Sequence, residues 1–380
     1  MMMQVPQVDP MPLPGPVWLL KTLLLTVFTL HLLAMNCTLG AGLTAGFNAL
    51  RGRSKQHPFS RRLASELAGM MPIFVAFTVS LGVAALLFVQ VLYGNLLYTS
   101  SILLGGVWLS VIALVIVGYY GYYYFSMRYE ANPRRAAIVA LIAFACFLTI
   151  AFIFVNNMTL MLTPARWFAM YKAHPNGWNL NLAENSLIPR YLHVIFGAFA
   201  VFSAVVVHLG THKVKKDREY GLWLIRRAGA IFAILTGVQF FVGTWFLLAL
   251  PRDVAMVFLR SPVGGAVFGF SLLFALAAMM LMLIAGFVKK PAPLAHSGLL
   301  ATLITVVLMV VMRDMVRNAY LQPVFRVNEL SARPQVSVII LFFIIFLGGL
   351  GTLAYMIALV ARARPKPAAE KSLAGEAGSL

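Results

Sequence analysis

Long apolar runs recur along the whole chain, and they constrain its fold more than any other feature. Each run holds roughly 20 residues or more, enough to cross a hydrocarbon core about 30 Å thick as a helix. The strand-like alternation of an outer-membrane barrel is absent, and helices satisfy their backbone polar groups internally. We therefore expect an all-α membrane protein, a bundle of about nine transmembrane helices. The predicted spans are residues 17–46, 70–93, 103–126, 136–157, 189–209, 222–250, 262–288, 298–320 and 336–361.

The composition agrees with a membrane protein. Hydrophobic residues make up 61% of the 380 residues and charged residues only 11%, a balance that no water-soluble globule of this size needs. Lipid must therefore solvate most of the surface. The net charge of +19 could suggest a nucleic-acid partner, but the distribution of the basic residues argues against one.

The basic residues predict the orientation. Twenty of the 30 lysines and arginines follow the first, third, fifth, seventh and ninth spans. Connections rich in Lys and Arg stay in the cytoplasm, so we expect the N-terminus outside and the C-terminus in the cytoplasm. The first residues have no charged region or cleavage signal, so residues 17–46 are interpreted as a retained helix. The expected location is the bacterial inner membrane, as a multi-pass protein.

The chain is predicted to form one transmembrane domain, residues 1–361, followed by a disordered cytoplasmic tail, residues 362–380, which is rich in Ala, Lys, Pro and Gly. The longest connection, about residues 158–188, is polar and lies on the outer side. Cys37 and Cys146 both fall inside apolar spans, so we expect neither a disulfide framework nor a thiolate metal cluster.

Ionisable side chains inside a bilayer cost a few kcal/mol, so each is a functional candidate. His31 lies near the middle of the first span, and His193 lies one turn into the fifth. Asp314 and Arg317 are three residues apart, share a helix face and can pair, with Arg313 beside them. The alternatives are histidines that bond to a neighbouring helix and a plain interfacial salt bridge.

The other histidines carry weaker signals. His208 follows His193 by fifteen residues, a spacing close to that of two haems stacked across a bilayer. It also lies beside a Lys-rich connection, where an interfacial histidine is expected, and that interpretation is favoured. The remaining histidines are expected in connections, facing water: His57, His174, His212 and His296.

Taken in order, several segments resemble subunit I of the cytochrome bd quinol oxidases, nine-helix haem proteins with an outward N-terminus. They are HLLAMNCTLGAG, NNMTLMLTP, PRYLHVIFGAFAV, GVQFFVGTW, LRSPVGGA and RDMVRNAY. The resemblance implies one or more b-type haems and a second haem of unknown type. It places His31 and His193 on haem-ligand positions and Asp314 on a haem-binding carboxylate, a third metal ligand. It also places Arg260 and Arg317 on the family's arginines, which with Arg313 would hold propionates.

Three departures from the family pattern bear on function. Pro262 stands where the family has the methionine opposite the low-spin haem, and proline cannot ligate iron. The quinol-binding loop is reduced to about ten residues, and its functional lysine and glutamate are replaced at or near Asp253 and Phe258. No carboxylate occurs between Glu66 and Glu130, the region that carries buried proton-delivering glutamates in the family.

The resemblance and its departures predict a haem-binding integral membrane subunit of a respiratory electron-transfer complex. It would pass electrons between the quinone pool and a redox partner, either a second membrane subunit or a periplasmic cytochrome c. One alternative is an active bd-type quinol:oxygen oxidoreductase subunit. The other is a haem-less membrane transporter or scaffold, although the paired helix interruptions of a transporter site are absent from the sequence.

Reporter fusions test the orientation. Fusions after Lys215 or Lys371 should report a cytoplasmic location, and fusions near Asn176 a periplasmic one, because the basic connections stay inside. A periplasmic signal at Lys371 would require an even number of spans and would contradict the nine-helix topology.

Overall fold

The computed structural model describes residues 12–363. They divide into two compact units: a main unit, residues 18–330, and a second unit, residues 12–17 together with 331–363. Within the described residues, nine helices are long and apolar enough to cross a membrane. The prediction of an all-α, multi-pass membrane protein with about nine spans is therefore confirmed.

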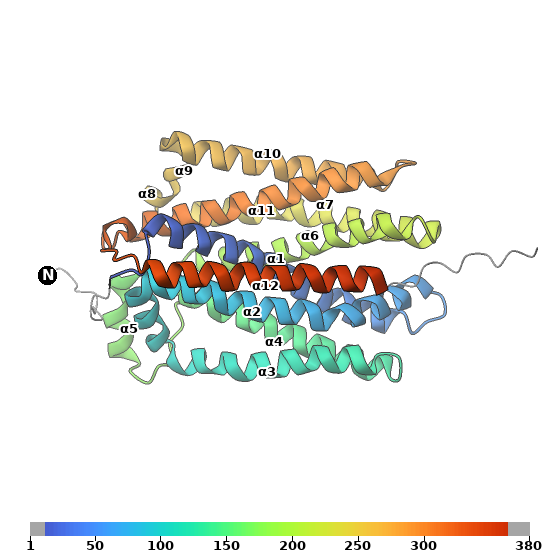
Figure 1. Cartoon of the computed structure of the whole chain (residues 1–380), viewed down its shortest axis with the longest axis horizontal. Helices are drawn as coiled ribbons and strands as arrows, with labels where there is room; N and C mark the ends of the chain where they lie inside the picture. The colour runs from blue at the N-terminus through green and yellow to red at the C-terminus, as the bar shows by residue number, and fades with distance from the viewer. Residues whose placement is uncertain (1–11, 364–380) are drawn as a thin grey trace, which may run out of the picture. The chain divides into compact units, whose positions relative to one another are not determined.

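Most of the nine long helices are joined by short connections, whereas the connection from α4 to α6, residues 162–186, is longer and contains η1 and α5 (Figure 1). The long helices are α1 (Val17–Arg51), α2 (Pro58–Leu103), α3 (Gly105–Arg128), α4 (Pro133–Met161), α6 (Leu187–Lys213), α7 (Arg218–Ala249), α10 (Pro262–Ala285), α11 (Pro291–Leu321) and α12 (Val336–Ala363). The short elements are η1 (Pro164–Arg166), α5 (Trp167–Ala173), α8 (Arg252–Ala255), α9 (Val257–Arg260) and η2 (Val327–Glu329).

Local sequence signals set where the helices begin. Proline occupies the first turn of α2, α4, α10 and α11, where its missing N–H costs nothing. The side chains of Asn132, Asp217 and Ser261 accept hydrogen bonds from the first-turn amides of α4, α7 and α10. Several helices consequently extend beyond the predicted apolar spans, which mark only the part that crosses lipid. His212 and His296, expected in connections, lie in α6 and α11.

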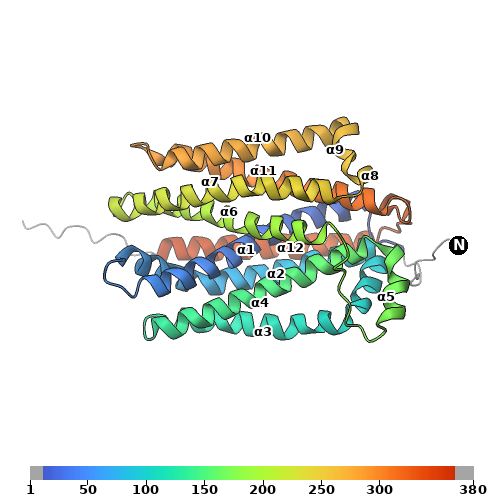
Figure 2. The same cartoon turned by 180° about the vertical axis from the view of Figure 1, so that it is seen from behind.

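In the main unit, α6 packs against α7, α3 against α4, and α10 against both α11 and α7. Figures 1 and 2 show α6, α7, α10 and α11 along one side of this unit and α2, α3 and α4 along the other. Helix α1 crosses between the two groups. The free cysteines Cys37 and Cys146 lie in α1 and α4.

Small residues let α1 approach its neighbours closely. Gly40 faces the Phe202 ring of α6, Gly42 faces the Tyr122 hydroxyl of α3, and neither position has room for a Cβ atom. Ala41 and Ala45 of the same helix are completely buried. Close backbone approach through small residues is a common way for helices to associate in lipid, where the hydrophobic effect gives little help.

Helix α2 is 46 residues long, much longer than the span predicted over residues 70–93. Its helical geometry breaks at Tyr93, whose φ and ψ are −131° and 27°, and the helix then continues to Leu103. The Tyr93 side chain is almost completely buried. The apolar run therefore ends at a kink rather than at the end of the helix.

At one end of the main unit, a partly buried ionic network joins α2 to α6 and to the start of α7. Arg62 Nη1 lies 2.5 Å from Asp217 Oδ2, and Lys213 Nζ lies 2.6 Å from Glu66 Oε1. The amide of Tyr220 and the Arg62 guanidinium both donate to Asp217, and these bonds hold the pKa of its carboxyl below the usual range. The charge of Lys213 is consequently already matched by a carboxylate.

The second unit pairs the start of the chain with the segment that precedes α12. The Leu13 amide donates to the Ser331 carbonyl at 2.9 Å, and the Leu13 carbonyl accepts from the Arg333 amide at 3.0 Å. The predicted tail, residues 362–380, lies outside the described residues except for its first two positions. The predicted single domain, residues 1–361, stays a prediction.

Substitution at Gly40 tests the packing of α1. Gly40→Ala should lower the free energy of unfolding by about 1–3 kcal/mol, because its Cβ would overlap the Phe202 ring. The midpoint of thermal unfolding in detergent measures the effect. Gly69→Ala is the matched control, since a Cβ there meets nothing within 4 Å. Equal midpoints for the two variants would contradict the close packing of α1 on α6.

Candidate functional site

The His31 ring is fixed by a hydrogen bond to the neighbouring helix. His31 Nδ1 lies 3.0 Å from the Thr78 carbonyl oxygen of α2. A carbonyl oxygen can only accept, so Nδ1 carries the proton and Nε2 presents its lone pair. Histidines that bind metals usually donate their second ring nitrogen in this way.

A glycine makes room for the same ring. A Cβ atom at Gly82 of α2 would lie 2.8 Å from His31 Cε1, so a larger residue there would displace the imidazole. Thr78, which accepts the His31 hydrogen bond, is itself held by a 2.6 Å hydrogen bond between its hydroxyl and that of Thr38. The position and tautomer of His31 are therefore determined by α2.

His193 lies in α6 and has a different environment. Its Nδ1 atom is buried and has no hydrogen-bond partner among the described residues. The main-chain carbonyl of His193 accepts from Gln239 Nε2 of α7 at 2.7 Å. One turn further along α7, a Cβ at Gly243 would lie 3.2 Å from His193 Cε1. The imidazole thus faces a glycine and has a ring nitrogen left free for a bound group.

Asp314 is the centre of a buried ionic cluster at the end of α11. Its carboxylate accepts from Arg317 on the same helix, which confirms the predicted pair. It also accepts from Lys21 Nζ of α1 at 2.8 Å and from Asn318 Nδ2 at 3.0 Å. Asp314 and Arg317 are both buried, so the cluster joins α1 to α11 away from water.

Aromatic rings hold the arginines of this region. The Arg317 guanidinium lies 4.2 Å from the centre of the Tyr93 ring. The Arg313 guanidinium lies 4.3 Å from the centre of the Phe28 ring. Such cation–π contacts orient a guanidinium without neutralising its charge. The salt bridges of Asp314 go to Lys21 and Arg317, and none joins Asp314 to Arg313.

Arg190 adds a further cation. Its guanidinium lies 4.8 Å from the centre of the Phe246 ring, and its Nε is buried without a hydrogen-bond partner among the described residues. Arg190 and Arg317 both lie within electrostatic range of Arg313, as does His31.

Cations consequently outnumber carboxylates around the end of α11 in the described part of the chain. A site with an excess of buried positive charge is suited to a ligand that carries carboxylate or phosphate groups. The carboxylates are Asp314 and Glu184, and the cations are Lys21, Arg166, Arg190, Arg313 and Arg317.

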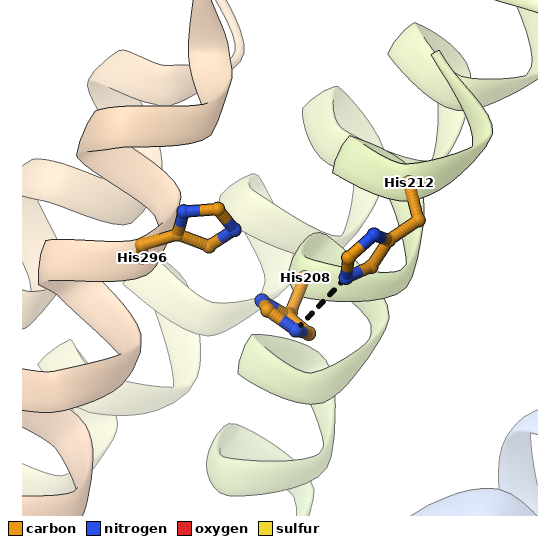
Figure 3. A group of neighbouring side chains, drawn as sticks. All are labelled: His208, His212 and His296. Carbon is orange, nitrogen blue, oxygen red and sulfur yellow. Dashed lines mark hydrogen bonds between the residues drawn. The ribbon is translucent and has the colours of Figure 1, made fainter. Parts of the chain in front are cut away.

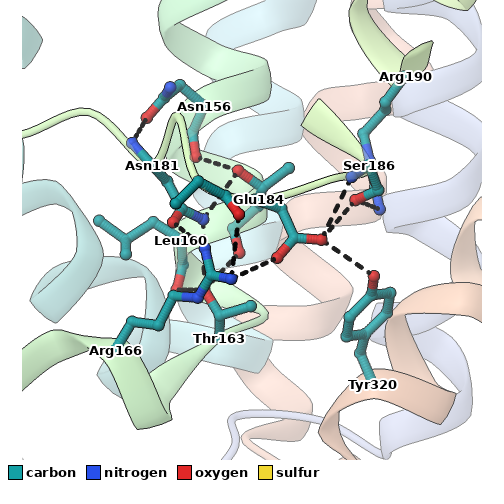
Figure 4. A network of polar contacts seen from close by, with 11 residues as sticks. Asn156, Leu160, Thr163, Arg166, Asn181, Glu184, Ser186, Arg190 and Tyr320 are labelled. Atoms are coloured by element: carbon teal, nitrogen blue, oxygen red, sulfur yellow. Dashed lines mark hydrogen bonds and ion pairs between the residues drawn. The ribbon is translucent and has the colours of Figure 1, made fainter. Parts of the chain in front are cut away.

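The connection between α4 and α6 is folded against the same region (Figure 4). Glu184 Oε1 accepts from the Ser186 hydroxyl at 2.9 Å and from the Tyr320 hydroxyl of α11 at 3.4 Å. Arg190 Nη2 donates to Ser186 Oγ at 3.4 Å. Glu184 therefore links the connection between α4 and α6, the start of α6 and the end of α11.

A second set of bonds fixes the base of this loop. The Asn181 amide donates to Asn156 Oδ1 of α4 at 2.9 Å, and Arg166 Nη1 donates to Asn181 Oδ1 at 3.1 Å (Figure 4). The Trp167 indole donates to the Leu160 carbonyl at 2.9 Å. The segment predicted only as a polar outer connection is thus an ordered wall of the site.

Two of the residues singled out in the sequence lie apart from the cluster. Arg260 ends α9 with an exposed side chain, and no ion pair joins it to the other predicted residues in residues 12–363. Pro262 lies in the first turn of α10 and offers no ligating atom. The connection from α7 to α10 is short, as predicted, and consists mainly of α8 and α9.

Sequence reasoning missed several residues that the fold brings to this site, among them Lys21, Tyr93, Glu184 and Arg190. A signal existed for Lys21, because it is a charged residue within the first apolar run. Tyr93 and Glu184 carried no such signal, since their roles depend on contacts with distant segments.

Comparison with known proteins identifies the architecture. No protein-family model matches the sequence, and no curated protein matches it. A chain from the structure of the bd oxidase of Geobacillus thermodenitrificans superposes with a TM-score of 0.66, over 93% of this chain and 100% of that chain. The chain has a bd-oxidase-like fold. The sequence identity is 12%, so the likeness establishes the fold and leaves the chemistry to the residues.

The residues present fit a haem in two respects. His31 and His193 are helix-borne imidazoles, each with a ring nitrogen that is free to ligate iron. The excess of cations near them matches the two propionates of a haem. Asp314 fits less directly, because its oxygens already accept from Arg317, Lys21 and Asn318. These three donors use most of the roughly four lone-pair sites of a carboxylate, and Oδ1, which accepts from Arg317 alone, is the oxygen left for a further ligand.

Proposed function

We propose that this chain is a haem-binding integral membrane subunit of a respiratory electron-transfer complex. The observation that carries the proposal is the pair of imidazoles with a free ring nitrogen, in a bd-oxidase-like bundle beside an excess of buried positive charge. When bound, a b-type haem would supply one-electron transfer. The haem would pass electrons between the quinone pool and a redox partner.

The roles of the residues follow from their surroundings. His31 and His193 are the proposed axial ligands. The proposed cofactor is one or more haems b, with a second haem of unknown type. Asp314 is a third candidate ligand that also balances Lys21 and Arg317. Arg313 is the best-placed propionate partner, since its charge is not matched by Asp314. Arg317 is a second propionate partner.

The side chain of Arg260 is exposed, so it would have to adopt another conformation to reach a haem propionate. It is therefore the weakest member of the proposed set, although its position in LRSPVGGA resembles the family's arginine.

The membrane setting is part of the proposal. The chain would lie in the bacterial inner membrane with its N-terminus outside, as the basic connections predict. Exposed apolar side chains on α10, including Val263 and Leu273, supply a surface for lipid or for a second membrane subunit. A periplasmic cytochrome c is the other proposed redox partner.

The nearest alternative is an active bd-type quinol:oxygen oxidoreductase subunit. Reduction of oxygen consumes protons, and a site inside a bilayer needs ionisable groups or water to deliver them. Between Glu66 and Glu130 the chain has no carboxylate. In that part of α2 the buried side chains that carry a polar group are Thr78, Tyr93 and Ser100, which offer only hydroxyls. Hydroxyl groups do not ionise near neutral pH, so we favour electron transfer without oxygen turnover.

Substitution of the proposed ligands tests haem binding. His193→Ala should abolish or strongly shift a b-type band in the reduced-minus-oxidised spectrum of the purified protein, because it removes the buried ring nitrogen. Gly82→Ala should shift the spectrum less, by displacing the His31 ring. His174→Ala, an exposed loop residue, is the control and should leave the spectrum unchanged.

If His193→Ala and His31→Ala keep the haem content and spectrum of the parent protein, the ligand assignment is wrong. A parent protein that contains no haem after extraction would favour the transporter or scaffold alternative.

Oxygen consumption separates the proposal from the oxidase alternative. The purified complex should be reduced by quinol and reoxidised by its redox partner, with no sustained consumption of oxygen, because a proton relay is missing from α2 and α3. An oxygen electrode with excess quinol gives the measurement. Sustained consumption that His31→Ala abolishes would establish the oxidase instead.

A further inference from the structure

Three histidines from two helices meet at the end of the main unit opposite to Asp314. His208 and His212 lie near the end of α6, and His296 lies in the first turns of α11. One ligand atom from each lies within 4.8 Å of the other two. Figure 3 shows the His208 ring between the other two rings.

The two histidines of α6 already have the spacing of metal ligands. Residues four apart lie on one face of a helix, and His208 Nε2 and His212 Nε2 are 3.2 Å apart. Tetrahedral zinc sites have Zn–N bonds of about 2.0–2.1 Å, which places neighbouring nitrogens roughly 3.3–3.4 Å apart. The pair therefore matches two corners of such a site.

A hydrogen bond between the two rings would also give this distance, but it would leave other features unexplained. The Nδ1 atom of His208 is buried and has no hydrogen-bond partner among the described residues. The third ring, that of His296, lies with its centre 5.0 Å from that of His208. A convergence of three imidazoles on one point is what a shared ion would organise.

His296 supplies the third ligand from a different helix. Its ring and that of His212 are exposed, so both side chains can change rotamer freely. The longest separation, 4.8 Å, has to shorten by only about 1.5 Å to reach the tetrahedral distance. Rotation of an exposed side chain covers that change without movement of either backbone.

The charges around the cluster select the kind of ion. Lys213, next to His212, is paired with Glu66 at 2.6 Å, so its charge is already balanced. No carboxylate belongs to the cluster, which excludes a site for magnesium or calcium, since these require oxygen ligands. Neutral imidazoles suit zinc, copper and nickel.

A haem does not fit this cluster. Axial ligands bind haem iron from opposite faces of the macrocycle, and two nitrogens 3.2 Å apart leave no room for a ring between them. The cluster is also separate from His31 and His193, which lie elsewhere in α1 and α6.

We propose that His208, His212 and His296 form a mononuclear site for a divalent transition-metal ion of the zinc class. Three protein ligands leave a fourth position open to water, and the exposure of His212 and His296 lets the ion enter from solvent. The site would fasten the end of α6 to the start of α11. It does not depend on the proposed haem.

Zinc binding to the full-length protein tests the site. The protein is purified in detergent through a tag without histidine, stripped with a chelator, and titrated with Zn²⁺ against a chromogenic competitor. We expect one ion bound per chain. His296→Ala and His212→Ala should each weaken binding by about a hundredfold or more, since even outer partners of a metal site contribute roughly 10–100-fold.

His174→Ala is the matched control, because His174 is exposed and lies in the outer loop. It should bind Zn²⁺ like the parent protein. Equal binding by His296→Ala and the parent would overturn the proposal, as would an equal loss in His174→Ala. Thermal unfolding midpoints of the variants without metal verify that they are folded.

Haem extraction from the same variants separates this site from the proposed haem site. Unchanged haem content in His296→Ala, together with loss of Zn²⁺ binding, supports a mononuclear metal site. Loss of haem from His296→Ala would assign the cluster to a haem and overturn the proposal. If the parent protein binds zinc but contains no haem, the metal site is supported and the proposed haem function is contradicted.

Discussion

The ion pairs of Asp314 hold together two helices, α1 and α11, that lie far apart in the sequence. A charged side chain inside a membrane bundle costs several kcal/mol unless it is paired with good geometry. Asp314 of α11 meets this condition through Arg317 on its own helix and Lys21 of α1. Loss of either cation would leave a charge buried without its partner, so the register of α1 against α11 is fixed by these contacts.

The remaining features of this end are built on those pairs. The Arg317 guanidinium that pairs with Asp314 also lies over the Tyr93 ring, and Tyr93 stands at the kink of α2. Glu184 reaches α11 through Tyr320 and reaches Arg190 through Ser186. Four helices and the connection between α4 and α6 thus share one electrostatic environment, positive overall, beside the imidazoles that we propose as iron ligands.

The sequence predicted the parts of this arrangement that depend on residues close together in the chain. Apolar runs gave the number of spans, because the length of a run is set by the thickness of the hydrocarbon core. They did not give the ends of the helices, since Pro58 and Asp217 begin helices outside the lipid-crossing part. For that reason His212 and His296 were expected in connections although they lie in helices.

The same distinction holds for the site. The Asp314–Arg317 pair could be predicted from a spacing of three residues. The contact between Lys21 and Asp314 could not, because it joins segments that only the tertiary fold brings together. His31 and His193 were singled out as ionisable side chains inside apolar spans, and the resemblance of their segments suggested haem ligation. The bd-oxidase-like fold is confirmed at 12% identity. Their roles as ligands stay predictions.

The contacts that fix Asp314 bear on the reorganisation energy of electron transfer at a nearby cofactor. Its carboxylate is held by three donors, and the neighbouring arginines are clamped on aromatic rings. Groups held in this way cannot reorient when a nearby site gains or loses an electron, and preorganised charges need no rearrangement at the moment of reaction. A cofactor beside them would therefore exchange electrons with a small reorganisation energy, at a potential set in advance by the fold.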